Sequence, residues 1–313
     1  MATYLITGGA GFIGSNIAQT LVSRGENVRI LDNLATGKLE NIARIRDRVE
    51  FIEGDIRDFQ TVRAAVSGVD YVIHQAALPS VSRSIQDPVP TNETNVTGTL
   101  NVLLACREQK VKRFVMASSS SVYGDTPKLP KSEEMALNPL SPYATSKLAA
   151  ERYAMNFYKL YGLETVALRY FNVFGPHQDP KSQYAAVIPK FITAILKGEP
   201  PVVYGDGEQS RDFTFVSNVV EANILACTAE KAPGYCMNIA CGGRYTLNQL
   251  LQMLEEIIGR KANATYTEPR PGDIKHSHAS IDLAREILNY EPKVSFEEGL
   301  RRTVGWYKEI LRL

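Results

Sequence analysis

Short apolar runs recur along the first half of the chain, and longer amphipathic stretches separate them. We expect strands at residues 4–7, 28–31, 49–52, 71–74, 114–117 and 165–168. Helices are expected at residues 14–24, 59–67, 92–109 and 143–161. Because the strands are apolar on both faces and alternate with helices, the pattern predicts an α/β fold with a doubly wound parallel sheet covered on both sides.

After residue 172 the pattern becomes less regular, and Pro and Gly become frequent. Short helices alternate with loops such as KGEPPVVYGDGEQ and EPRPGD. We therefore expect a smaller C-terminal α/β lobe grafted onto the sheet. The sheet domain is assigned residues 1–171 together with about 213–240, and the lobe is assigned residues 172–212 and 241–313.

The composition is that of a globular protein, and it narrows the range of partners. Of the 313 residues 44% are hydrophobic, and the net charge is +1 without a basic stripe, so nucleic acid is not expected as a partner. The N-terminus lacks a signal-peptide pattern, and no segment has the apolar length of a membrane span. The cysteines have neither CxxC nor disulfide-framework spacing, which favours the cytoplasm: Cys106, Cys227, Cys236 and Cys241.

A glycine-rich turn, GGAGFIG, follows the first expected strand and opens the first expected helix. Its glycines at Gly8, Gly11 and Gly14 have GxxGxxG spacing. Glycine allows a tight turn and a close approach of backbone to a pyrophosphate, and the helix N-terminus offers free N–H groups to an anion. A glycine trio alone is weak evidence, but its position between strand and helix predicts a dinucleotide site on a Rossmann sheet.

Polar and small residues follow the next strands at the edge where a ligand would lie. Asp32 and Asn33 end the second strand, and an acid there favours NAD over NADP because it binds ribose hydroxyls and repels a 2′-phosphate. Residues 55–56 end the third strand and residues 75–77 end the fourth. Each signal is weak by itself, yet together they trace one ligand along the sheet edge.

Tyr143 and Lys147 have i,i+4 spacing in SPYATSK, so a helix that starts near Pro142 places both on one face. A phenol titrates near pH 10 and needs a nearby positive charge to act as a base at neutral pH. The serines at 118–121 follow the fifth strand and bring hydroxyls to the same edge. A polar helix surface and a polar loop would explain either motif alone, but their joint occurrence with the glycine turn favours catalysis.

With these motifs in place, the chain resembles the extended short-chain dehydrogenases/reductases, and within them the nucleotide-sugar (UDP-glucose and UDP-N-acetylglucosamine) 4-epimerases. The resemblance spans nearly the whole chain. It rests on TGGAGFIGS, Asp32-Asn33, HQAA, residues 91–101, SSSSVYG, SPYATSK, RYFNVFGP, YAAVIPKF, GDGEQSRDF and RPGD.

The resemblance implies NAD as cofactor and a role for each catalytic residue. Tyr143 would be the base on the C4 hydroxyl of the sugar, Lys147 would hold the nicotinamide ribose and lower the pKa of Tyr143, and Ser119 would bind the C4 oxygen. The implied cofactor-binding residues are Gly8, Gly11, Phe12, Ile13, Gly14, Asp32, Asn33, Gly37, Asp55, Ile56, Gln75, Ala76, Ala77, Asn95, Ser118, Tyr143, Lys147 and Tyr170.

The implied substrate is a UDP-sugar. Arginines in the Gly/Pro-rich lobe agree with this, because guanidinium groups grip a diphosphate well. The implied substrate-binding residues are Ser80, Ser82, Arg83, Ser119, Ser120, Tyr143, Asn172, Ala186, Val187, Val202, Tyr204, Arg211, Arg270, Asp273 and Ser277.

The expected reaction is 4-epimerisation through a transient 4-keto sugar with NAD retained. Related dehydratases carry Thr-Asp-Glu and related decarboxylases a Glu before Val-Tyr-Gly, where this chain has the serines 119–121. Without a second acid–base pair the ketone can only be reduced again. A UDP-glucose-only or UDP-glucuronate 4-epimerase, or a 4,6-dehydratase, remains the alternative.

Ser277 bears on the choice of sugar. It occupies the position that acts in the family as a size gate, where a small residue admits a 2-acetamido group. We therefore expect activity on UDP-GlcNAc/UDP-GalNAc and also on UDP-Glc/UDP-Gal. His276 and His278 flank it, but no third ligand is near in the sequence, so no metal is expected. The resemblance also suggests a homodimer through a four-helix bundle.

Overall fold

The computed structural model describes residues 1–180, 186–269 and 275–312. Its largest sheet in these ranges has seven parallel strands in the order β11-β6-β5-β4-β1-β2-β3. This confirms the doubly wound parallel sheet, and the strand order reverses between β1 and β4, where such sheets bind ligands. In chain order the strands are β1 (Thr3–Thr7), β2 (Asn27–Asp32), β3 (Val49–Glu53), β4 (Tyr71–His74), β5 (Arg113–Ser119), β6 (Thr165–Tyr170) and β11 (Cys236–Ile239).

Helices cover both faces of this sheet, because successive strand residues point to opposite sides. Leu5 packs in one apolar cluster and Ile6 in another. The cluster of Ile6 includes residues of α1 (Phe12–Ser23), the 3-10 helix η1 (Leu39–Arg48) and α8 (Val216–Thr228). The cluster of Leu5 includes residues of α2 (Phe59–Val66), α5 (Thr99–Glu108) and α6 (Pro142–Tyr161).

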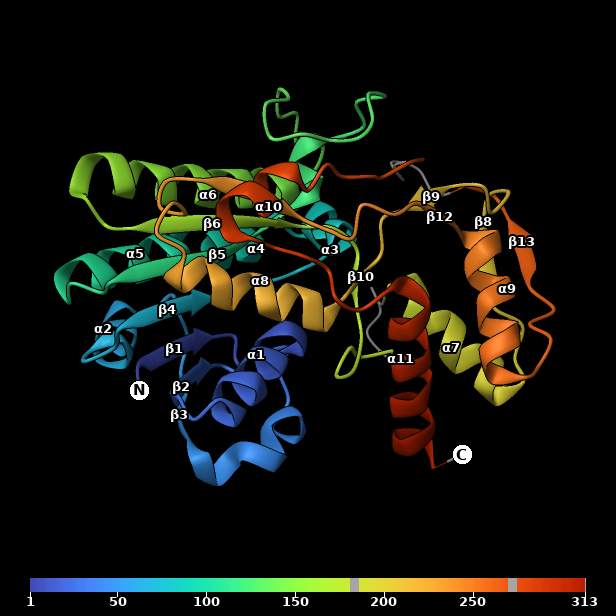
Figure 1. Cartoon of the computed structure of the whole chain (residues 1–313), viewed down its shortest axis with the longest axis horizontal. Coiled ribbons are helices and arrows are strands. Elements are labelled where there is room, and N and C mark those ends of the chain that lie inside the picture. The colour runs from blue at the N-terminus through green and yellow to red at the C-terminus, as the bar shows by residue number, and fades with distance from the viewer. Residues whose placement is uncertain (181–185, 270–274, 313) are drawn as a thin grey trace.

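The later part of the chain builds a smaller group of helices and strand pairs. Figure 1 shows α7, α9 and α11 on the side of the sheet toward which its strands point. A cluster of rings joins this part together, with Phe296 5.5 Å from Phe174 and 5.0 Å from Phe213 between ring centroids. The helices are α7 (Val187–Lys197), α9 (Leu247–Ile258), α10 (Asp282–Leu288) and α11 (Phe296–Leu311).

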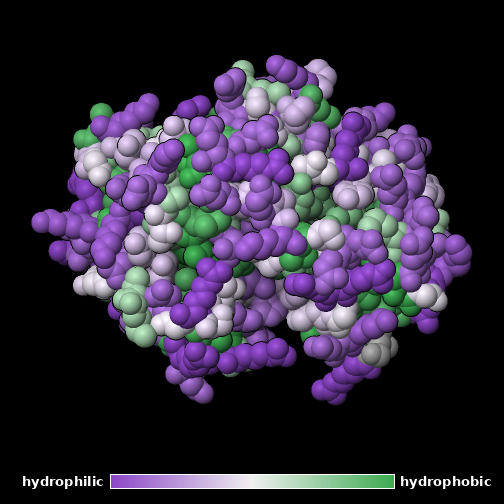
Figure 2. All heavy atoms as spheres, in the orientation of Figure 1, coloured by the Kyte–Doolittle hydropathy of each residue, from purple (hydrophilic) through white to green (hydrophobic). Residues whose placement is uncertain are grey.

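Three short strand pairs lie outside the large sheet. The parallel pairs are β7 (Val173–Phe174) with β10 (Thr214–Phe215) and β8 (Val202–Tyr204) with β13 (Thr265–Thr267). The antiparallel pair is β9 (Ser210–Arg211) with β12 (Tyr245–Thr246). The face seen in Figure 2 is mostly hydrophilic, and apolar side chains gather in smaller areas between the charged ones.

The structure differs from the expected helix at residues 92–109. It has α4 (Pro88–Asn92), a π-helical segment η2 (Glu93–Gly98) and then α5. The π-helical segment holds Asn95, whose side chain accepts from the Leu78 N–H at 2.8 Å, and Gly98, which packs against Ile56. Such π-bulges concentrate at functional sites. The six-residue helix α3 (Val81–Gln86) is too short for its periodicity to be seen in the sequence.

Candidate functional site

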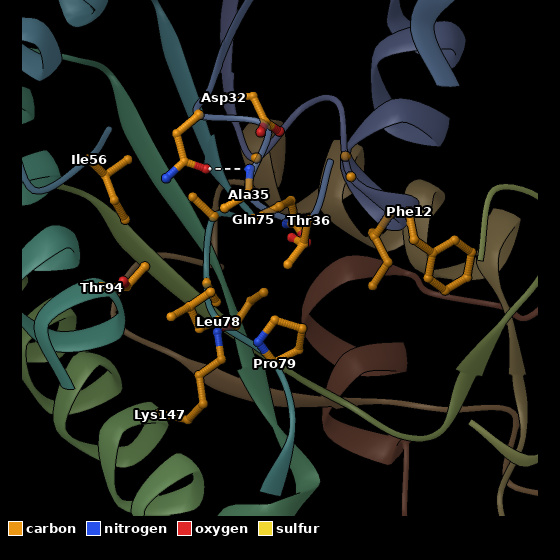
Figure 3. A pocket seen from close by; sticks show the side chains of 18 of the residues that line it. Phe12, Asp32, Ala35, Thr36, Ile56, Gln75, Leu78, Pro79, Thr94 and Lys147 are labelled. Carbon is orange, nitrogen blue, oxygen red and sulfur yellow. Dashed lines mark hydrogen bonds between the residues drawn. The ribbon is translucent and has the colours of Figure 1, made fainter. Parts of the chain in front are cut away.

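A cavity of about 460 Å³ opens at the carboxyl edge of the sheet. Figure 3 shows Asp32, Gln75 and Lys147, which come from β2, the end of β4 and α6, around it. The expected site residues that line this cavity are Gly8, Gly11, Phe12, Ile13, Gly14, Asp32, Asn33, Ile56, Gln75, Ala76, Ala77, Ser118, Ser119, Tyr143, Lys147, Tyr170 and Asn172.

The glycine turn forms a cradle that a larger side chain would fill. A Cβ on Gly14 would lie 2.2 Å from the Gly8 carbonyl oxygen, and one on Gly8 would lie 2.7 Å from the Ala76 nitrogen. Helix α1 has Gly11 as its N-cap, with no side-chain cap hydrogen bond. The N-terminus of α1 is therefore open to an anion at the cavity, and the turn fits a dinucleotide pyrophosphate.

Asp32 is a carboxylate that the backbone holds in place beside this turn. It accepts from the Ala10 N–H at 2.9 Å and from the Leu34 N–H at 2.8 Å. Burial raises the pKa of Asp32, and these two backbone hydrogen bonds oppose that rise. Gly37 does not line the cavity, but a Cβ on it would lie 2.8 Å from both Asp32 carboxylate oxygens, so glycine leaves room for the carboxylate.

Asn33 and Asp55 form a second polar group at the same edge. The Asn33 amide donates to Asp55 at 2.8 Å, and the Ala35 N–H donates to Asn33 at 3.0 Å, close to the labelled Ala35 in Figure 3. Hydrogen bonds from Arg57 are the largest cause that lowers the pKa of Asp55 to about 2. Asp55 does not line the cavity. It forms hydrogen bonds with Asn33 and Arg57, and both of these residues do line it.

Tyr143 and Lys147 lie on one face of α6 and both line the cavity. Ser141 caps this helix by accepting from the Ala144 N–H at 3.1 Å. The Lys147 ammonium donates to the Ala117 carbonyl at 2.9 Å, and burial lowers its pKa to about 8. Lys147 is therefore still mostly protonated at pH 7.

Burial raises the pKa of the Tyr143 phenol, and an interaction with the Ser119 hydroxyl opposes that rise. The sequence predicted that Lys147 lowers this pKa. Desolvation of the phenolate outweighs the one hydroxyl that interacts with it, and the role of Lys147 stays a prediction. Tyr143 is also fixed through its backbone, since its N–H donates to the Ser84 hydroxyl of α3 at 3.0 Å.

A buried ion pair lies one helical turn beyond Lys147 on α6. Arg169 on β6 donates to Glu151 on α6 at 2.6 Å, and both side chains are nearly inaccessible to solvent. The Ser118 hydroxyl also donates to Glu151, at 2.7 Å. Ser118 therefore keeps only lone pairs for a ligand in the cavity. Asn95 lies outside the cavity lining and supports its wall by a bond to Ser146 at 3.0 Å.

A second cavity of about 280 Å³ is lined by residues between 172 and 247, all of them outside the seven-stranded sheet. Asn172 and Val173 line both cavities, so the two are neighbours. The expected substrate residues that line it are Asn172, Ala186, Val187, Val202, Tyr204 and Arg211. Arg211 donates to the Lys275 carbonyl at 3.0 Å, which ties β9 to the segment that leads to Ser277.

Several expected substrate residues are not in either lining. Ser80, Ser82 and Arg83 lie at α3, where the Ser80 hydroxyl accepts from the Arg83 N–H at 3.2 Å. The N–H of Ser277 donates to the Ser210 carbonyl at 2.9 Å, next to Arg211. Ser120 lies in the 3-10 turn η3 (Ser120–Tyr123). Arg270 and Asp273 fall outside the described residues.

The structure also adds lining residues that the sequence analysis missed. Most of them are chain neighbours of residues that were predicted, as Leu31 precedes Asp32 and Leu78 follows Ala77. That adjacency is the only signal the sequence offered for them. In the second cavity, Lys190 and Phe191 lie one helical turn after Val187 on α7, and Gln209 and Phe213 lie two residues either side of Arg211, whereas Leu247 begins the separate helix α9.

The described residues hold neither a metal-binding cluster nor a membrane-spanning helix. No group of three or more His, Cys, Asp or Glu side chains is arranged to hold a metal ion there. None of the helices in the same ranges has the length and apolar character needed to cross a bilayer.

Comparisons with known proteins agree with this geometry. The model of the NAD-dependent epimerase/dehydratase family matches residues 4–240. A UDP-N-acetylglucosamine 4-epimerase from Methanobrevibacter ruminantium, solved with UDP-N-acetylmuramic acid, is 42% identical with a TM-score of 0.95 and covers 100% of this chain and 99% of its own. A Thermotoga maritima UDP-glucose 4-epimerase, solved with UDP-glucose, is 39% identical with a TM-score of 0.94 and 99% coverage of both chains.

A curated relative also matches this chain over nearly its whole length. The putative UDP-glucose 4-epimerase of Methanocaldococcus jannaschii is 40% identical over 306 residues, which cover 97% of this chain and 98% of the relative. The glycine cradle, the backbone-held Asp32 and the Tyr143–Lys147 face are thus found in a chain that matches the family over most of its length. The chain belongs to the NAD-dependent epimerase/dehydratase family, and its cofactor is NAD.

Proposed function

We propose that this protein is a UDP-sugar 4-epimerase that interconverts UDP-GlcNAc and UDP-GalNAc, and also UDP-Glc and UDP-Gal. The observation that carries the proposal is the junction of the two cavities at Asn172 and Val173. One cavity holds the acid–base set Tyr143, Lys147 and Ser119, and the other holds Arg211 in a largely apolar wall. A nucleotide-sugar fits this arrangement with its sugar at the junction.

In this proposal the phenolate of Tyr143 takes the proton from the C4 hydroxyl of the sugar, and the phenol so formed later returns it. The Ser119 hydroxyl donates to the same oxygen and stabilises the charge that develops on it. Lys147 remains protonated beside the phenol and favours the phenolate. Bound NAD would supply reversible hydride transfer at C4, so that the 4-keto sugar could be reduced again on its opposite face.

The residues of the cofactor cavity account for tight retention of NAD. The open N-terminus of α1 binds the pyrophosphate, and Asp32 binds ribose hydroxyls. Because the reaction regenerates NAD in each cycle, release is unnecessary. We therefore expect the purified protein to carry NAD and to turn over without added cofactor.

Arg211, Tyr204 and Val187 support a UDP subsite in the second cavity. The guanidinium of Arg211 pairs with the diphosphate, and the apolar wall that includes Phe191 accommodates the uracil ring. Asn172 helps to bind the phosphate of the sugar-nucleotide. The roles of Arg270 and Asp273 in holding the same diphosphate stay predictions from the sequence.

In this proposal, the segment that carries Ser277 determines which class of sugar the protein accepts. Its backbone pairs with Ser210, directly before Arg211 of the second cavity, which supports a place near the sugar. A small side chain there leaves space for a 2-acetamido group. Ser80, Ser82 and Arg83 complete the sugar subsite from α3, which is bonded to Tyr143 through Ser84.

A 4,6-dehydratase is the second candidate, and the hydroxyl turn argues against it. Serines occupy positions 119–121, at the end of β5 and the start of η3, so no carboxylate is available there for a second proton transfer. With a single acid–base set, the 4-keto sugar is reduced again instead of losing water.

The test is incubation of the purified protein with UDP-GlcNAc, without added NAD, and chromatography of the products. UDP-GalNAc should form, and Tyr143→Phe should reduce the rate at least about 100-fold because the proton acceptor is lost. Tyr158→Phe, which removes a hydroxyl from the exposed side of the same helix, is the matched control. A keto sugar as product would overturn the proposal in favour of the dehydratase.

Ser277→Tyr tests the sugar class in the same assay. It should remove turnover of the N-acetylated pair and retain turnover of UDP-Glc and UDP-Gal, because the tyrosine ring occupies the space of the acetamido group. Persistence of both activities would contradict the proposed role of Ser277.

We also propose that the protein is a cytoplasmic homodimer that pairs α5 and α6 of two copies as a four-helix bundle. Exposed apolar side chains on α6 support this: Tyr153, Leu160 and Tyr161 have 39%, 71% and 52% of their surface accessible. Sedimentation at micromolar concentration should give twice the mass of the 34.7 kDa chain, and a monomeric mass would refute the dimer.

A further inference from the structure

One segment of the chain, residues 175–179, is bonded to the start of helix α1. The Asn16 amide donates to the Pro176 carbonyl at 3.1 Å. The Ser15 hydroxyl lies 2.8 Å from Nδ1 of His177, a hydrogen bond that forms whichever of the two groups donates. Ser15 is inaccessible to solvent. The segment therefore holds the helix that begins at the glycine turn.

A third contact joins the same segment to the turn that follows β2. The Lys38 ammonium and the Asp179 carboxylate form an ion pair at 2.6 Å. Lys38 directly follows Gly37, which packs against the Asp32 carboxylate, and its own N–H donates to the Ala10 carbonyl at 3.0 Å. The ion pair thus attaches the segment to the part of the cofactor site that carries Asp32.

Helix α11 fixes the segment as well. The rings of His177 and Trp306 lie 5.7 Å apart between centroids, and the Tyr307 hydroxyl donates to the Gln178 carbonyl. Residues 175–179 are therefore held between α1 and the later part of the chain.

These contacts bear on how the NAD cavity opens. Residues 12–14 of α1 line the cavity, and so does Val173, which lies two residues before the segment. Widening of the cavity between α1 and Val173 therefore separates α1 from residues 175–179 and breaks the contacts that join them. All of these contacts are between protein groups, so they oppose opening whether NAD is entering or leaving.

We propose that residues 175–179 act as a clasp whose contacts with α1 and Lys38 must break before NAD enters or leaves the cavity. His177 and Asp179 are positioning residues in this role, since neither lines a cavity. The inference requires only that NAD is the cofactor, and it is independent of the sugar that the protein accepts. It adds a kinetic cause of retention to the binding contacts at the glycine turn and at Asp32.

The test measures NAD exchange in the purified protein loaded with NAD that is labelled in its adenine ring. Loss of label after addition of excess unlabelled NAD gives the release rate. His177→Gly is the main variant, because glycine readily adopts the left-handed backbone of this position, with φ of 72°. It should release NAD at least about fivefold faster, the effect of one lost hydrogen bond.

The dissociation constant distinguishes a clasp from a cofactor contact. In His177→Gly the Kd for NAD, measured by calorimetric titration, should change less than about twofold, because easier opening speeds entry by the same factor as release. A contact that acts only in the bound complex would raise the Kd together with the release rate.

His177→Asn is the conservative variant. Asparagine also tolerates the left-handed backbone, and its side chain has a polar atom near the place of the ring Nδ1. It should keep the bond to Ser15 and return the release rate to within about twofold of the unaltered protein.

The ion pair offers two matched charge reversals. Asp179→Lys sets a like charge against Lys38 and should speed release about threefold. Glu221→Lys is the control, because its partner Arg24 lies at the other end of α1 and the two ion pairs are similarly exposed. It should leave the release rate unchanged. This pair of variants tests the clasp even if His177→Gly does not fold.

The proposal would be overturned by an unchanged release rate in His177→Gly or in Asp179→Lys. Faster release with a matching rise in Kd would also overturn it, since that result places the effect in the bound complex and not in the opening step. Equal acceleration by Glu221→Lys would trace the effect to a general loosening of α1. Failure of His177→Asn to restore the rate would exclude the bond to Ser15 as part of the clasp.

Discussion

His74 is held uncharged inside the sheet next to the catalytic cavity. Its Nδ1 lies 2.7 Å from the Thr7 hydroxyl and its Nε2 lies 2.9 Å from the Thr99 hydroxyl. Burial is the main cause that lowers the pKa of His74 to about 3, and the charge of Lys147 adds to it. The two threonines satisfy a neutral ring, so protonation would require a buried charge without a compensating partner.

At this residue scale we predict a pH-dependent loss of stability. The unfolded chain has an ordinary histidine pKa of 6.5, so it binds the proton before the folded chain does as the pH falls. The stabilisation by His74 is therefore complete above pH 6.5 and is lost as the pH falls toward 3, at up to about 1.4 kcal/mol per pH unit. Urea denaturation at pH 7, 6 and 5 measures it.

The matched variant is His74→Gln, which keeps hydrogen-bonding groups but does not titrate. It should be less stable at pH 7 and should show a flatter dependence on pH between 7 and 5. Parallel curves for the two proteins would show that His74 is not responsible for the acid sensitivity.

At the scale of elements, the passage from β1 through the glycine turn to α1 is the most tightly packed part of the cofactor site. Three separate segments meet there: the turn itself, the end of β4 at Ala76, and Ile30 of β2, whose side chain would lie 2.6 Å from a Cβ on Gly9. The backbone itself blocks a side chain at Gly14, so no rotamer change could relieve the clash.

Gly14→Ala should therefore impair both folding and NAD binding. Its Cβ would meet the Gly8 oxygen at 2.2 Å, which requires the turn to move. We expect a destabilisation of about 1–3 kcal/mol, as for other overpacked sites, and at least a tenfold weaker affinity for NAD. Denaturation and calorimetric titration with NAD measure the two effects.

Gly305→Ala in α11 is the control, because a Cβ there would meet nothing within 4 Å. The substitution replaces a glycine inside a helix, so it should stabilise the protein by about 0.5–1 kcal/mol and leave the affinity for NAD unchanged. If the two variants had the same stability and the same affinity for NAD, the close contact at Gly14 would have no special effect.

At the scale of the whole molecule, one buried polar network connects the catalytic helix with the later part of the chain. Arg169 binds Glu151 on one side and donates to the Tyr123 hydroxyl at 2.8 Å on the other. Tyr123 donates to Asn238 of β11 at 2.7 Å, and Asn238 donates to the Ser280 carbonyl at 3.1 Å. The network thus runs from α6 through β6 and β11 to the segment that follows Ser277.

Glu151→Gln should destabilise the fold by about 3 kcal/mol, because it leaves the buried Arg169 charge without its counterion. The control is Glu297→Gln, whose partner Arg301 is more than half exposed, and its effect should stay within about 0.5 kcal/mol. Chemical denaturation measures both. If Glu151→Gln lost as little stability as Glu297→Gln, this would mean that water reaches Arg169 when residue 151 is neutral.

The division of the chain into two domains is a proposal at the same scale. We propose residues 1–171 with about 213–240 as the NAD-binding domain, and residues 172–212 and 241–313 as the UDP-sugar-binding lobe. Strand β11 and helix α8, which pack with the large sheet, support the return of the chain to the first domain. Limited proteolysis near these boundaries, in the presence of NAD, would test it.

The sequence by itself determined the features that depend on local backbone geometry. Periodicity of apolar residues predicted the doubly wound sheet, and the Gly8–Gly11–Gly14 spacing predicted the turn at its edge. The i,i+4 spacing of Tyr143 and Lys147 predicted their common face. These patterns follow from the repeat of a helix or strand, or from the lack of a Cβ, so they are visible without knowledge of distant neighbours.

Only the tertiary structure decided which distant residues meet. The place of Gly37 above Asp32, the π-helical turn around Asn95 and the meeting of the two cavities at Asn172 depend on packing between separate elements. The balance of effects on Tyr143 is also tertiary, because burial of the phenol outweighs its interaction with Ser119. Desolvation depends on everything that surrounds a group, and spacing along the chain does not encode it.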